Sequence, residues 1–419
     1  MDIEKKKMGI ALDIGTTTLA ASLVDIESGA HLREISMANP QVHRGLDVLE
    51  RVKAMEGKAE VLHELNKSLI AACDALISKL TAGSPVGAVT VAGNSIMEHF
   101  FLGVSPASMA KVPYKPLFKE ARTVPASELG LASAGECEVY LFPMVGGFVG
   151  GDAVAAALAL GLIEEEENTL LVDVGTNSEI ILQAGGRLYS TSAAAGPAFE
   201  AAGISCGMTA GKGAIRGLSI KEDIVCLDVI GGITARGICG SGLLDAVSAL
   251  LKAGIIDKTG RILSAHEVSS GLSGRMKSDP SGNRFILSRS AAATLSITQE
   301  DIRALQVAKA AIRAGITTLM EKAGLSAVDI KKIHIAGAFG SNLTMRGLID
   351  VGLIDTLWSD IVNFAGDSAL EGAAMALADE KKAQAEWLAA NITYQPLSGS
   401  KIFEGEFIKH MDFPEDDRV

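Results

Sequence analysis

The residues with the clearest chemical potential in this chain stand in a short motif that occurs twice. Residues 13–16 read Asp-Ile-Gly-Thr and residues 173–176 read Asp-Val-Gly-Thr, and each motif follows an apolar run typical of a buried strand. A second apolar run follows each motif, so the pattern predicts a tight turn between two strands. Glycine permits such a turn, and threonine supplies hydroxyl and backbone N–H groups that bind anions. Two such turns facing each other would bind opposite sides of a nucleotide's phosphates, and the repetition predicts a duplicated fold.

Strands, glycine-rich turns and helices alternate around these motifs. Apolar residues repeat at helical spacing over 59–80, and a pattern that resembles a capping box at 298–301 opens a helix expected to reach Met320. Short buried strands are expected over 86–92 and 332–336. This alternation is typical of an α/β protein that binds ligands at the carboxyl ends of its strands.

The segments between these elements indicate how the chain divides. Residues 37–57 are expected to form a polar connection, and residues 105–125 a loop. Four consecutive glutamates at 164–167 stand just before the second motif and read as a solvated linker. We therefore expect a first lobe of residues 1–164 and a second lobe of residues 165–419, with the final helices crossing back to the first lobe.

Length and composition narrow the possible functions. A chain of 419 residues is too long for one compact core, and 48% hydrophobic with 21% charged residues is typical of a well-packed globular protein. The net charge of −12 argues against nucleic acid as the main partner, because binding to phosphate backbones needs a basic face. The five cysteines include no Cys-x-x-Cys pair, so no iron–sulfur cluster, zinc site or disulfide framework is expected.

The sequence also predicts a cytoplasmic protein without a membrane partner. Its first residues lack the apolar core of a signal peptide. Residues 141–163 are almost uncharged and long enough to span a bilayer, but they contain Pro143, two pairs of glycines at 146–147 and 150–151, and Asp152. A carboxylate within a membrane costs about 2.5–3.5 kcal/mol. A buried strand or loop that leads into a buried helix is therefore expected here.

Three motifs together resemble one superfamily of ATPases. The two Asp-x-Gly-Thr motifs and the run Ile335-Ala336-Gly337-Ala338-Phe339-Gly340 are similar, in order and spacing, to the two phosphate motifs and the adenosine motif of the acetate-kinase, sugar-kinase, Hsp70 and actin (ASKHA) superfamily. The resemblance implies a two-lobed α/β fold, actin-like or ribonuclease H-like, with duplicated sheets and a central nucleotide cleft. ATP and Mg²⁺ are the cofactors that it implies.

Further motifs resemble a single family within this superfamily. They lie at residues 93–99, 196–200, 237–242 and 366–373, and they are similar to the carboxy-terminal ATPase region of the reductive activators of corrinoid proteins. The resemblance covers nearly the whole chain. It implies a homodimeric ATPase that binds the corrinoid protein of a methyltransferase system and supports reduction of its Co(II) cobamide to Co(I), with slow and partner-dependent hydrolysis.

The chain departs from this family in one respect. Such activators receive the electron through an amino-terminal iron–sulfur domain, for which this chain has neither the residues nor a cysteine cluster. The chain is then a fragment of a longer activator, or it uses a separate electron donor, or it handles no electrons. The Asp-x-His-x-x-Gly signature of cobalamin-binding domains is also absent, so the corrinoid is expected on a partner.

The resemblance assigns roles to individual residues. Asp13 and Asp173 are expected to hold Mg²⁺ through water and to take part in catalysis. Asp152 either orients the attacking water or caps a helix, and Asp367 either closes the site from the other lobe or caps a helix. The expected phosphate-binding residues are Gly15, Thr16, Thr17, Thr18, Gly175, Thr176 and Asn177, the expected adenosine-binding residues are Gly337, Ala338, Phe339 and Gly340, and further candidates are Gly240 and Ser241.

Two other classes of function stay open on the sequence alone. A small-molecule kinase of the same fold would need a pocket for an acceptor and would turn over rapidly with a sugar or an acid. An ATP-dependent activator of a different radical enzyme would hold a cluster through paired cysteines, which this chain lacks. A nucleotide sensor that does not hydrolyse ATP is a further alternative.

Overall fold

The chain divides into two compact units, each assembled from segments that are far apart in the sequence. The structure is a computed structural model that describes residues 8–291, 293–337 and 343–415. Unit 1 comprises residues 1–169, 181–191 and 367–395, and unit 2 comprises residues 170–180, 192–366 and 396–419. The division expected from the sequence lies between residues 164 and 165. Unit 1 also contains residues 165–169 and 181–191, which were not expected there, and residues 367–395, where helices near the C-terminus were expected to return to the first lobe.

The first six-stranded sheet presents the first Asp-x-Gly-Thr motif at the end of its central strand. Its strand order is β3-β2-β1-β4-β6-β5. Strand β1 pairs antiparallel with β2 and parallel with β4, so that Asp13 stands opposite both Ala20 and Ala92. The strands are β1 (Met8–Ile14), β2 (Thr18–Asp25), β3 (His31–Ala38), β4 (Ala88–Ala92), β5 (Arg122–Pro125) and β6 (Glu138–Leu141). The predicted hairpin around residues 8–24 is confirmed.

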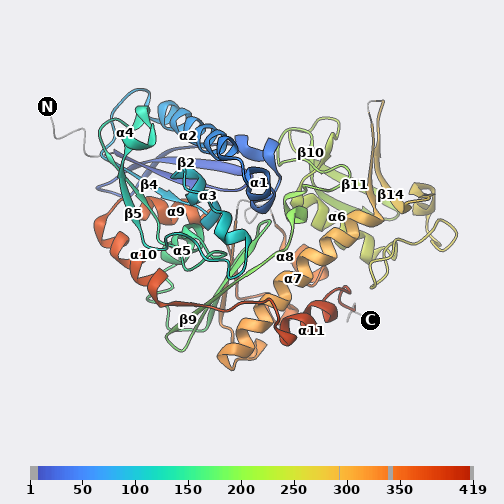
Figure 1. The fold of residues 1–419 in the computed structure, drawn as a ribbon. Coiled ribbons are helices and arrows are strands. Elements are labelled where there is room, and N and C mark those ends of the chain that lie inside the picture. Colours follow the sequence, from blue (N-terminus) through green and yellow to red (C-terminus); the bar gives the residue numbers. More distant parts are fainter. Residues whose placement is uncertain (1–7, 292, 338–342, 416–419) are drawn as a thin grey trace. The chain divides into compact units, whose positions relative to one another are not determined.

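Alternation of large and small side chains on β1 explains how helices cover both faces of this sheet (Figure 1). Successive residues of a strand point to opposite faces. Ile10, Leu12 and Ile14 enter the core built with helix α2 (Ala59–Thr81). Gly9 faces helix α9 (Ser368–Met375) and the residues after it, because a Cβ on Gly9 would lie 2.6 Å from a Leu377 side-chain carbon. Small residues on this second face let α9 and α5 (Gly151–Ala159) pack close to the strands.

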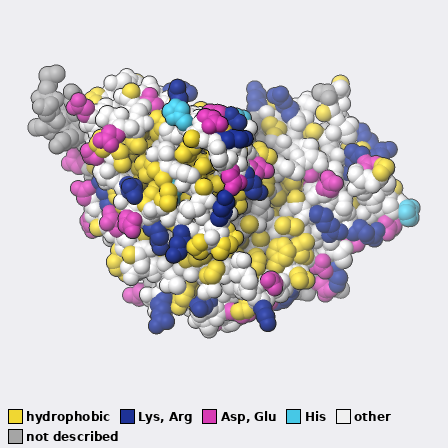
Figure 2. All heavy atoms as spheres, in the orientation of Figure 1, with side chains coloured by type: hydrophobic (Ala, Val, Ile, Leu, Met, Phe, Trp, Pro, Cys, Tyr) yellow, Lys and Arg dark blue, Asp and Glu magenta, His cyan; other side chains and the backbone are white. Residues whose placement is uncertain are grey.

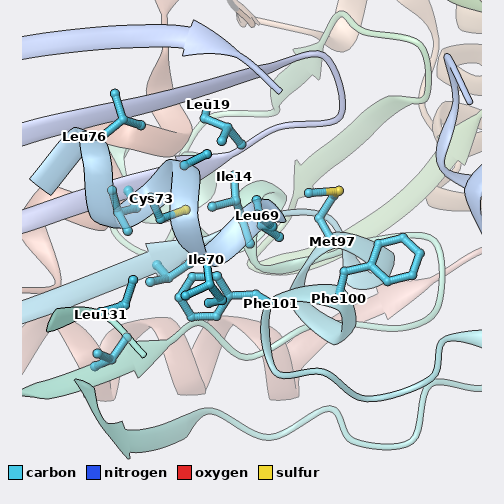
Figure 3. Close-up of a cluster of buried hydrophobic side chains, with 14 of the residues drawn as sticks. Ile14, Leu19, Leu69, Ile70, Cys73, Leu76, Met97, Phe100, Phe101 and Leu131 are labelled. Carbon is cyan, nitrogen blue, oxygen red and sulfur yellow. The ribbon is translucent and has the colours of Figure 1, made fainter. Parts of the chain in front are cut away.

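The hydrophobic core of unit 1 anchors the end of β1 directly. Figure 3 shows Ile14 and Leu19 among Leu69 and Cys73 of α2, with side chains of helix α3 (Ser95–Phe101) below them. All of these side chains are buried. The residues on either side of the Asp-x-Gly-Thr turn are therefore held by the core, while the turn itself stays outside it.

The second six-stranded sheet repeats the plan of the first. Its order is β17-β16-β7-β8-β9-β18, so the strand with the second motif has the following hairpin strand on one side and a later strand on the other, as β1 does. The strands are β7 (Thr169–Asp173), β8 (Ser178–Ala184), β9 (Arg187–Ala193), β16 (Lys332–Ala336), β17 (Val362–Gly366) and β18 (Ile392–Tyr394). The predicted duplicated fold is confirmed, with divergent ends.

Unit 2 contains two three-stranded sheets and the longest helix of the described chain, α7 (Gln299–Ala323). The predicted capping box is confirmed: Thr298 accepts a hydrogen bond from the backbone N–H of Asp301, whose carboxylate accepts one from the N–H of Thr298. Helix α11 (Lys401–Lys409) packs along α7 (Figure 1). The other elements are β10 (Ala214–Lys221), β11 (Ile224–Val229), β12 (Gly237–Ile238), α6 (Gly240–Lys252), β13 (Met276–Asp279), β14 (Gly282–Arg289), β15 (Thr294–Thr298) and α8 (Met345–Asp350).

Some sequence-based expectations need correction. The predicted polar connection over residues 37–57 contains a helix, α1 (Val48–Met55), capped by the side chain of Asp47. Its buried residues follow helical spacing, but a run of only eight residues contains too few repeats of that spacing to indicate a helix clearly. The expected loop over 105–125 ends in strand β5, which is followed by the short helix α4 (Ala126–Leu129). Unit 1 also contains helix α10 (Asp379–Asn391).

The uncharged segment over residues 141–163 forms the end of β6, a loop and the buried helix α5. Among the described residues, no helix has the length and apolar character needed to cross a membrane. On the face shown in Figure 2, acidic and basic side chains are interspersed with hydrophobic ones, without a continuous basic area.

The contact between α5 and α9 gives a test of this packing. A Cβ on Gly372 of α9 would lie 1.9 Å from the carbonyl oxygen of Ala155 on α5. Gly372→Ala is therefore expected to force the helices apart and to lower the free energy of unfolding by about 1–3 kcal/mol, as overpacking does. Urea titration followed by circular dichroism measures the change.

Gly405 provides the matched control, since it lies within helix α11 and no atom lies within 4 Å of the position that an added methyl group would take. Gly405→Ala is expected to be neutral or to stabilise the protein by up to about 1 kcal/mol, because alanine favours helix more than glycine does. Equal effects of the two substitutions would contradict the proposed close packing of α5 on α9.

Candidate functional site

The first Asp-x-Gly-Thr turn is held from outside by three side chains. The Asn39 side chain donates to the carbonyl oxygen of Gly15 at 2.9 Å, and Arg51 donates to that of Thr16 at 2.6 Å. Asn94, at the start of α3, donates to the Thr16 hydroxyl at 3.0 Å. The turn is thus fixed through its carbonyl oxygens and one hydroxyl, whereas Thr17 pairs with the backbone of Asn39 and Thr18 begins β2.

Arg51 is a structural residue of this turn that the sequence did not suggest. It is fully buried on α1, and it also donates to the carbonyl of Gly45 and the side chain of Gln41. Burial lowers the pKa of Arg51 to about 10, so the guanidinium still carries its charge at neutral pH. The helical spacing of Val48, Val52 and Met55 around it was the available signal.

Glycines bring the start of α5 into backbone contact with the turn between β4 and α3. A Cβ on Gly150 would lie 2.5 Å from the Cα of Asn94 and 2.6 Å from the carbonyl oxygen of Gly93. The backbone N–H of Asp152 donates to that same carbonyl at 3.1 Å. Asp152 is therefore held beside Asn94, which in turn contacts the Thr16 hydroxyl.

Asp152 does not cap its helix. The N-cap position belongs to Gly150, and Asp152 is the second residue of α5, where its carboxylate accepts a hydrogen bond from the N–H of Ala153 at 2.8 Å. The alternative of a plain N-cap is thus wrong. Burial raises the pKa of Asp152 to about 6, which brings its titration close to neutral pH. A carboxylate with such a pKa is suited to exchange protons near neutral pH.

A second acid, Glu98 of α3, is buried against the start of α5. Its side chain is fully buried, and neither carboxylate oxygen has a hydrogen-bond partner. A Cβ on Gly151 would lie 2.1 Å from Glu98 Oε1, so only glycine fits between the carboxylate and the helix. Burial first, and then the charge of Asp152, raises the pKa of Glu98 well above its ordinary value, although the backbone of Gly93 acts in the opposite direction.

The second turn, in unit 2, is held differently. The backbone N–H and the hydroxyl of Thr176 both donate to Oε1 of Glu200, at 2.9 and 2.8 Å. The N–H of Gly175 lies 3.3 Å from the hydroxyl of Ser178. In this structure a carboxylate therefore occupies donors that the sequence assigned to phosphate, and Asn177 completes the turn before β8. Glu200 was noticed only as part of the motif at residues 196–200.

The start of the third motif lies against the end of β7. The N–H of Val174 donates to the carbonyl of Ala336 at 3.1 Å, which places Gly337 beside the second motif. Gly337 has φ of +104°, and a Cβ there would lie 2.8 Å from Asp173 Oδ1. Both constraints favour glycine. Ala338, Phe339 and Gly340 lie outside the described residues.

The remaining candidates have structural partners. Gly240 and Ser241 begin α6, where a Cβ on Gly240 would lie 1.7 Å from the Phe199 carbonyl oxygen and the Ser241 hydroxyl donates to the carbonyl of Arg216 at 3.0 Å. Asp367 caps α9 by accepting a hydrogen bond from the N–H of Leu370 at 3.0 Å. The helix-cap alternative for Asp367 is therefore confirmed.

Two protein-family models match adjacent parts of the chain. The model described as the C-terminal domain of RACo, the ASKHA domain, matches residues 167–419. The model of the RACo middle region matches residues 8–165.

Individual relatives agree with these matches. The corrinoid activation enzyme RamQ of Eubacterium limosum is 32% identical over 391 residues, which cover 91% of this chain and 66% of that protein. A reductase of the Co(II) methylated amine-specific corrinoid protein from Methanosarcina barkeri is 28% identical over 393 residues, covering 86% of this chain and 68% of that protein.

A solved structure of a reductive activator for a corrinoid, iron–sulfur protein superposes with a TM-score of 0.89 at 34% identity. The superposition covers 99% of this chain and 67% of that one. The chain thus spans about two thirds of the length of the relatives that it matches. The predicted ASKHA fold is confirmed.

The burial of Glu98 has a consequence for stability. The pKa of Glu98 is higher in the folded state than in the unfolded state, so the unfolded chain releases this proton at a lower pH. The free energy of unfolding therefore falls as the pH rises above the pKa of Glu98 in the unfolded chain. Glu98→Gln removes this titration and keeps the shape of the side chain. It is expected to raise the free energy of unfolding by roughly 1–3 kcal/mol at pH 8 and by much less at pH 5.

Urea unfolding at both pH values measures the difference, with Glu128→Gln on the surface of α4 as the matched control. If Glu98→Gln instead lowers the free energy of unfolding at both pH values, the view that the Glu98 carboxylate lacks a partner is wrong.

Proposed function

Since the chain belongs to the RACo family, whose middle region and C-terminal ASKHA domain it matches in turn, we propose that it is an ATP-dependent activator of a corrinoid protein. In this proposal the chain binds and hydrolyses ATP and supports reduction of the partner's Co(II) cobamide to Co(I). The electron comes from another domain or another protein. The observation that carries the proposal is the pairing of these family matches with an ionisable Asp152 beside the first phosphate turn.

The proposed roles follow from the position of each residue. Asp13 is the second-last residue of β1 and Asp173 is the last residue of the equivalent strand β7, and their carboxylates suit a hydrated Mg²⁺ ion. In the described part of the chain no three His, Cys, Asp or Glu side chains converge on a metal position. The protein would therefore contribute few direct ligands, and water and phosphate oxygens would supply the others.

Asp152 is proposed to orient and deprotonate the attacking water. Its helix is fixed by glycine contacts with the β4–α3 turn, so the carboxylate is held in place before any substrate binds. Phosphoryl transfer depends on such positioning more than on a strong base. With a pKa of about 6, Asp152 is mostly ionised at neutral pH and can accept a proton.

Glu200 adds a step to nucleotide binding in this proposal. The N–H and hydroxyl of Thr176 donate to the Glu200 carboxylate, and in this proposal the same two donors would bind the γ-phosphate. The carboxylate would leave Thr176 when the phosphate binds, because two anions repel each other at the same donors. ATP hydrolysis can then change the state of the partner only if the ATP-bound and ADP-bound forms of this chain differ in their affinity for the partner's two states.

ATP turnover by the purified chain, with and without a corrinoid methyltransferase subunit in the Co(II) state, tests this function. The expected result is slow hydrolysis that rises at least tenfold when the corrinoid subunit is added. Rapid turnover with a sugar or carboxylic acid, and no response to the corrinoid subunit, would instead indicate a small-molecule kinase. The absence of any hydrolysis, with ATP still bound, would indicate a nucleotide sensor.

Asp152→Asn tests the proposed role of this carboxylate. The substitution is expected to lower the rate of ATP hydrolysis by about 100-fold, in the range found for general base catalysis, while the Kd of ATP changes less than threefold. The wild-type rate is expected to rise as the pH passes about 6, where Asp152 loses its proton, and the variant is expected to lack this rise.

The matched control is Asp379→Asn, at the exposed start of helix α10 in the same unit. Unchanged turnover in Asp152→Asn would assign the water-orienting role to another residue.

A further inference from the structure

Unit 2 contains a pocket whose lining includes no residue of the Asp-x-Gly-Thr turns. Its volume is about 1200 Å³, and it is lined by the end of α6, the middle of α7, helix α8 and the segment after α11. Apolar side chains such as Ile256, Ile354 and Phe413 form part of the wall. Six lysines and arginines and four carboxylates also line it, in a chain that is acidic as a whole.

The cations at the edge of this pocket are paired with carboxylates. Lys252 forms an ion pair with Asp350, and Lys258 forms one with Glu415. Arg346 is largely exposed and lies 3.7 Å from the same Asp350 carboxylate. These residues account for three of the basic side chains and two of the acidic ones.

Two other cations lie deeper, on one face of α7, and are poorly compensated. Lys309 is fully buried and donates to the backbone carbonyl of Asp412. Arg313 has a side chain that is 11% exposed, and its Nε and Nη1 atoms have no hydrogen-bond partner. The Asp355 carboxylate lies 3.7 Å from Nη2, the charge of Glu406 also acts on Arg313, and the guanidinium carbon lies 4.9 Å from the centre of the Trp358 ring.

The chemistry of these groups favours an anionic ligand. Burying a cation without a partner is expensive, so such groups are normally paired. Burial and then the charge of Arg313 lower the pKa of Lys309 to about 7, and burial and then Arg313 lower the pKa of His410 to about 4. Cations that repel one another in this way are stabilised when an anion binds between them.

We propose that this pocket binds a phosphate monoester, with its phosphate on Arg313 and Lys309 and its organic part against the apolar wall. The Nε and Nη1 atoms of Arg313 belong to different edges of the guanidinium, and each lacks a partner and can donate to one phosphate oxygen. A volume of about 1200 Å³ is far more than an inorganic ion needs and is in the range of organic ligands. The proposed site is separate from the ATP site, and it does not depend on the corrinoid function.

Titration calorimetry with phenyl phosphate as the probe tests this proposal. A saturating non-hydrolysable ATP analogue with Mg²⁺ is included so that the phosphate turns are occupied. Arg313→Met is expected to weaken binding of phenyl phosphate at least tenfold, whereas Arg187→Met, an exposed arginine of unit 1, is expected to leave it unchanged. Equal affinity of wild type and Arg313→Met would overturn the proposal.

Inorganic phosphate as a second probe distinguishes the two sources of the anion. Phenyl phosphate is expected to bind at least tenfold more tightly, because the apolar wall contributes to its binding. Equal affinity for the two probes would overturn the assignment to an organic monoester.

Thermal unfolding in phosphate-free buffer separates ligand binding from a structural role of Arg313. Because Nε and Nη1 have no partner, Arg313→Met is expected to keep or raise the Tm, and to lose the increase in Tm that phenyl phosphate causes in the wild type. A lower Tm with an undiminished response to phenyl phosphate would show that Arg313 is structural. Should this variant fail to fold, Arg313→Lys keeps the charge without the planar fork and is expected to lose about tenfold in affinity.

The pH dependence of sulfate binding gives an independent readout, because the charge of sulfate is constant over the range used. The charged and titratable groups that face Lys309 are Arg313 on its own helix and Asp412 and His410 from the C-terminal segment. Sulfate affinity is expected to fall severalfold between pH 6 and pH 8, as Lys309 loses its proton, and Lys309→Met is expected to abolish this change. An unchanged affinity of the wild type across this range would contradict a role for Lys309.

Discussion

The close approach of two backbones in unit 1 is the constraint on which the candidate site depends. Gly150 leaves no room for a side chain between the start of α5 and the turn after β4, and Gly151 leaves none between α5 and the Glu98 carboxylate. This contact lets the N–H of Asp152 bond to the carbonyl of Gly93, and it places Asp152 beside Asn94, the residue that holds Thr16. The same contact buries Glu98 without a partner. Burial of Glu98 thus lowers the stability of the fold at the place where the ionisable Asp152 is held, as is common at functional sites.

The two halves of the duplicated fold share their strand order but differ in how each turn is held. In the first turn, Asn39 and Arg51 bind carbonyl oxygens, which leaves the backbone fixed without using its N–H groups for that purpose. In the second turn, Glu200 accepts from the N–H and hydroxyl of Thr176. The first turn is therefore held through its carbonyl oxygens, whereas in the second turn an N–H and a hydroxyl donate to a carboxylate.

The sequence predicted the elements whose signals are local. The strand–turn–strand motifs, the amphipathic helix α2 and the Thr298 capping box depend on residues that are close in the sequence, and all three were confirmed. Arg51, Glu98 and Glu200 could not be predicted in the same way, because their roles arise from contacts with segments 24 to 53 residues away. The position of Asp152 within its helix depended on which of two neighbouring glycines occupies the cap. In the sequence, Lys309 and Arg313 are recognisable only as residues on one face of α7. Their burial depends on the C-terminal segment that packs against this helix.

The visible spectrum of the corrinoid protein tests the central claim most directly. The Co(II) form of the partner is mixed with this chain and a chemical one-electron reductant, and the spectrum is followed with ATP, with ADP and with a non-hydrolysable analogue. The Co(I) spectrum is expected to appear with ATP at least tenfold faster than with ADP or the analogue. An equal rate of Co(I) formation with and without ATP, while the chain hydrolyses ATP, would contradict this claim.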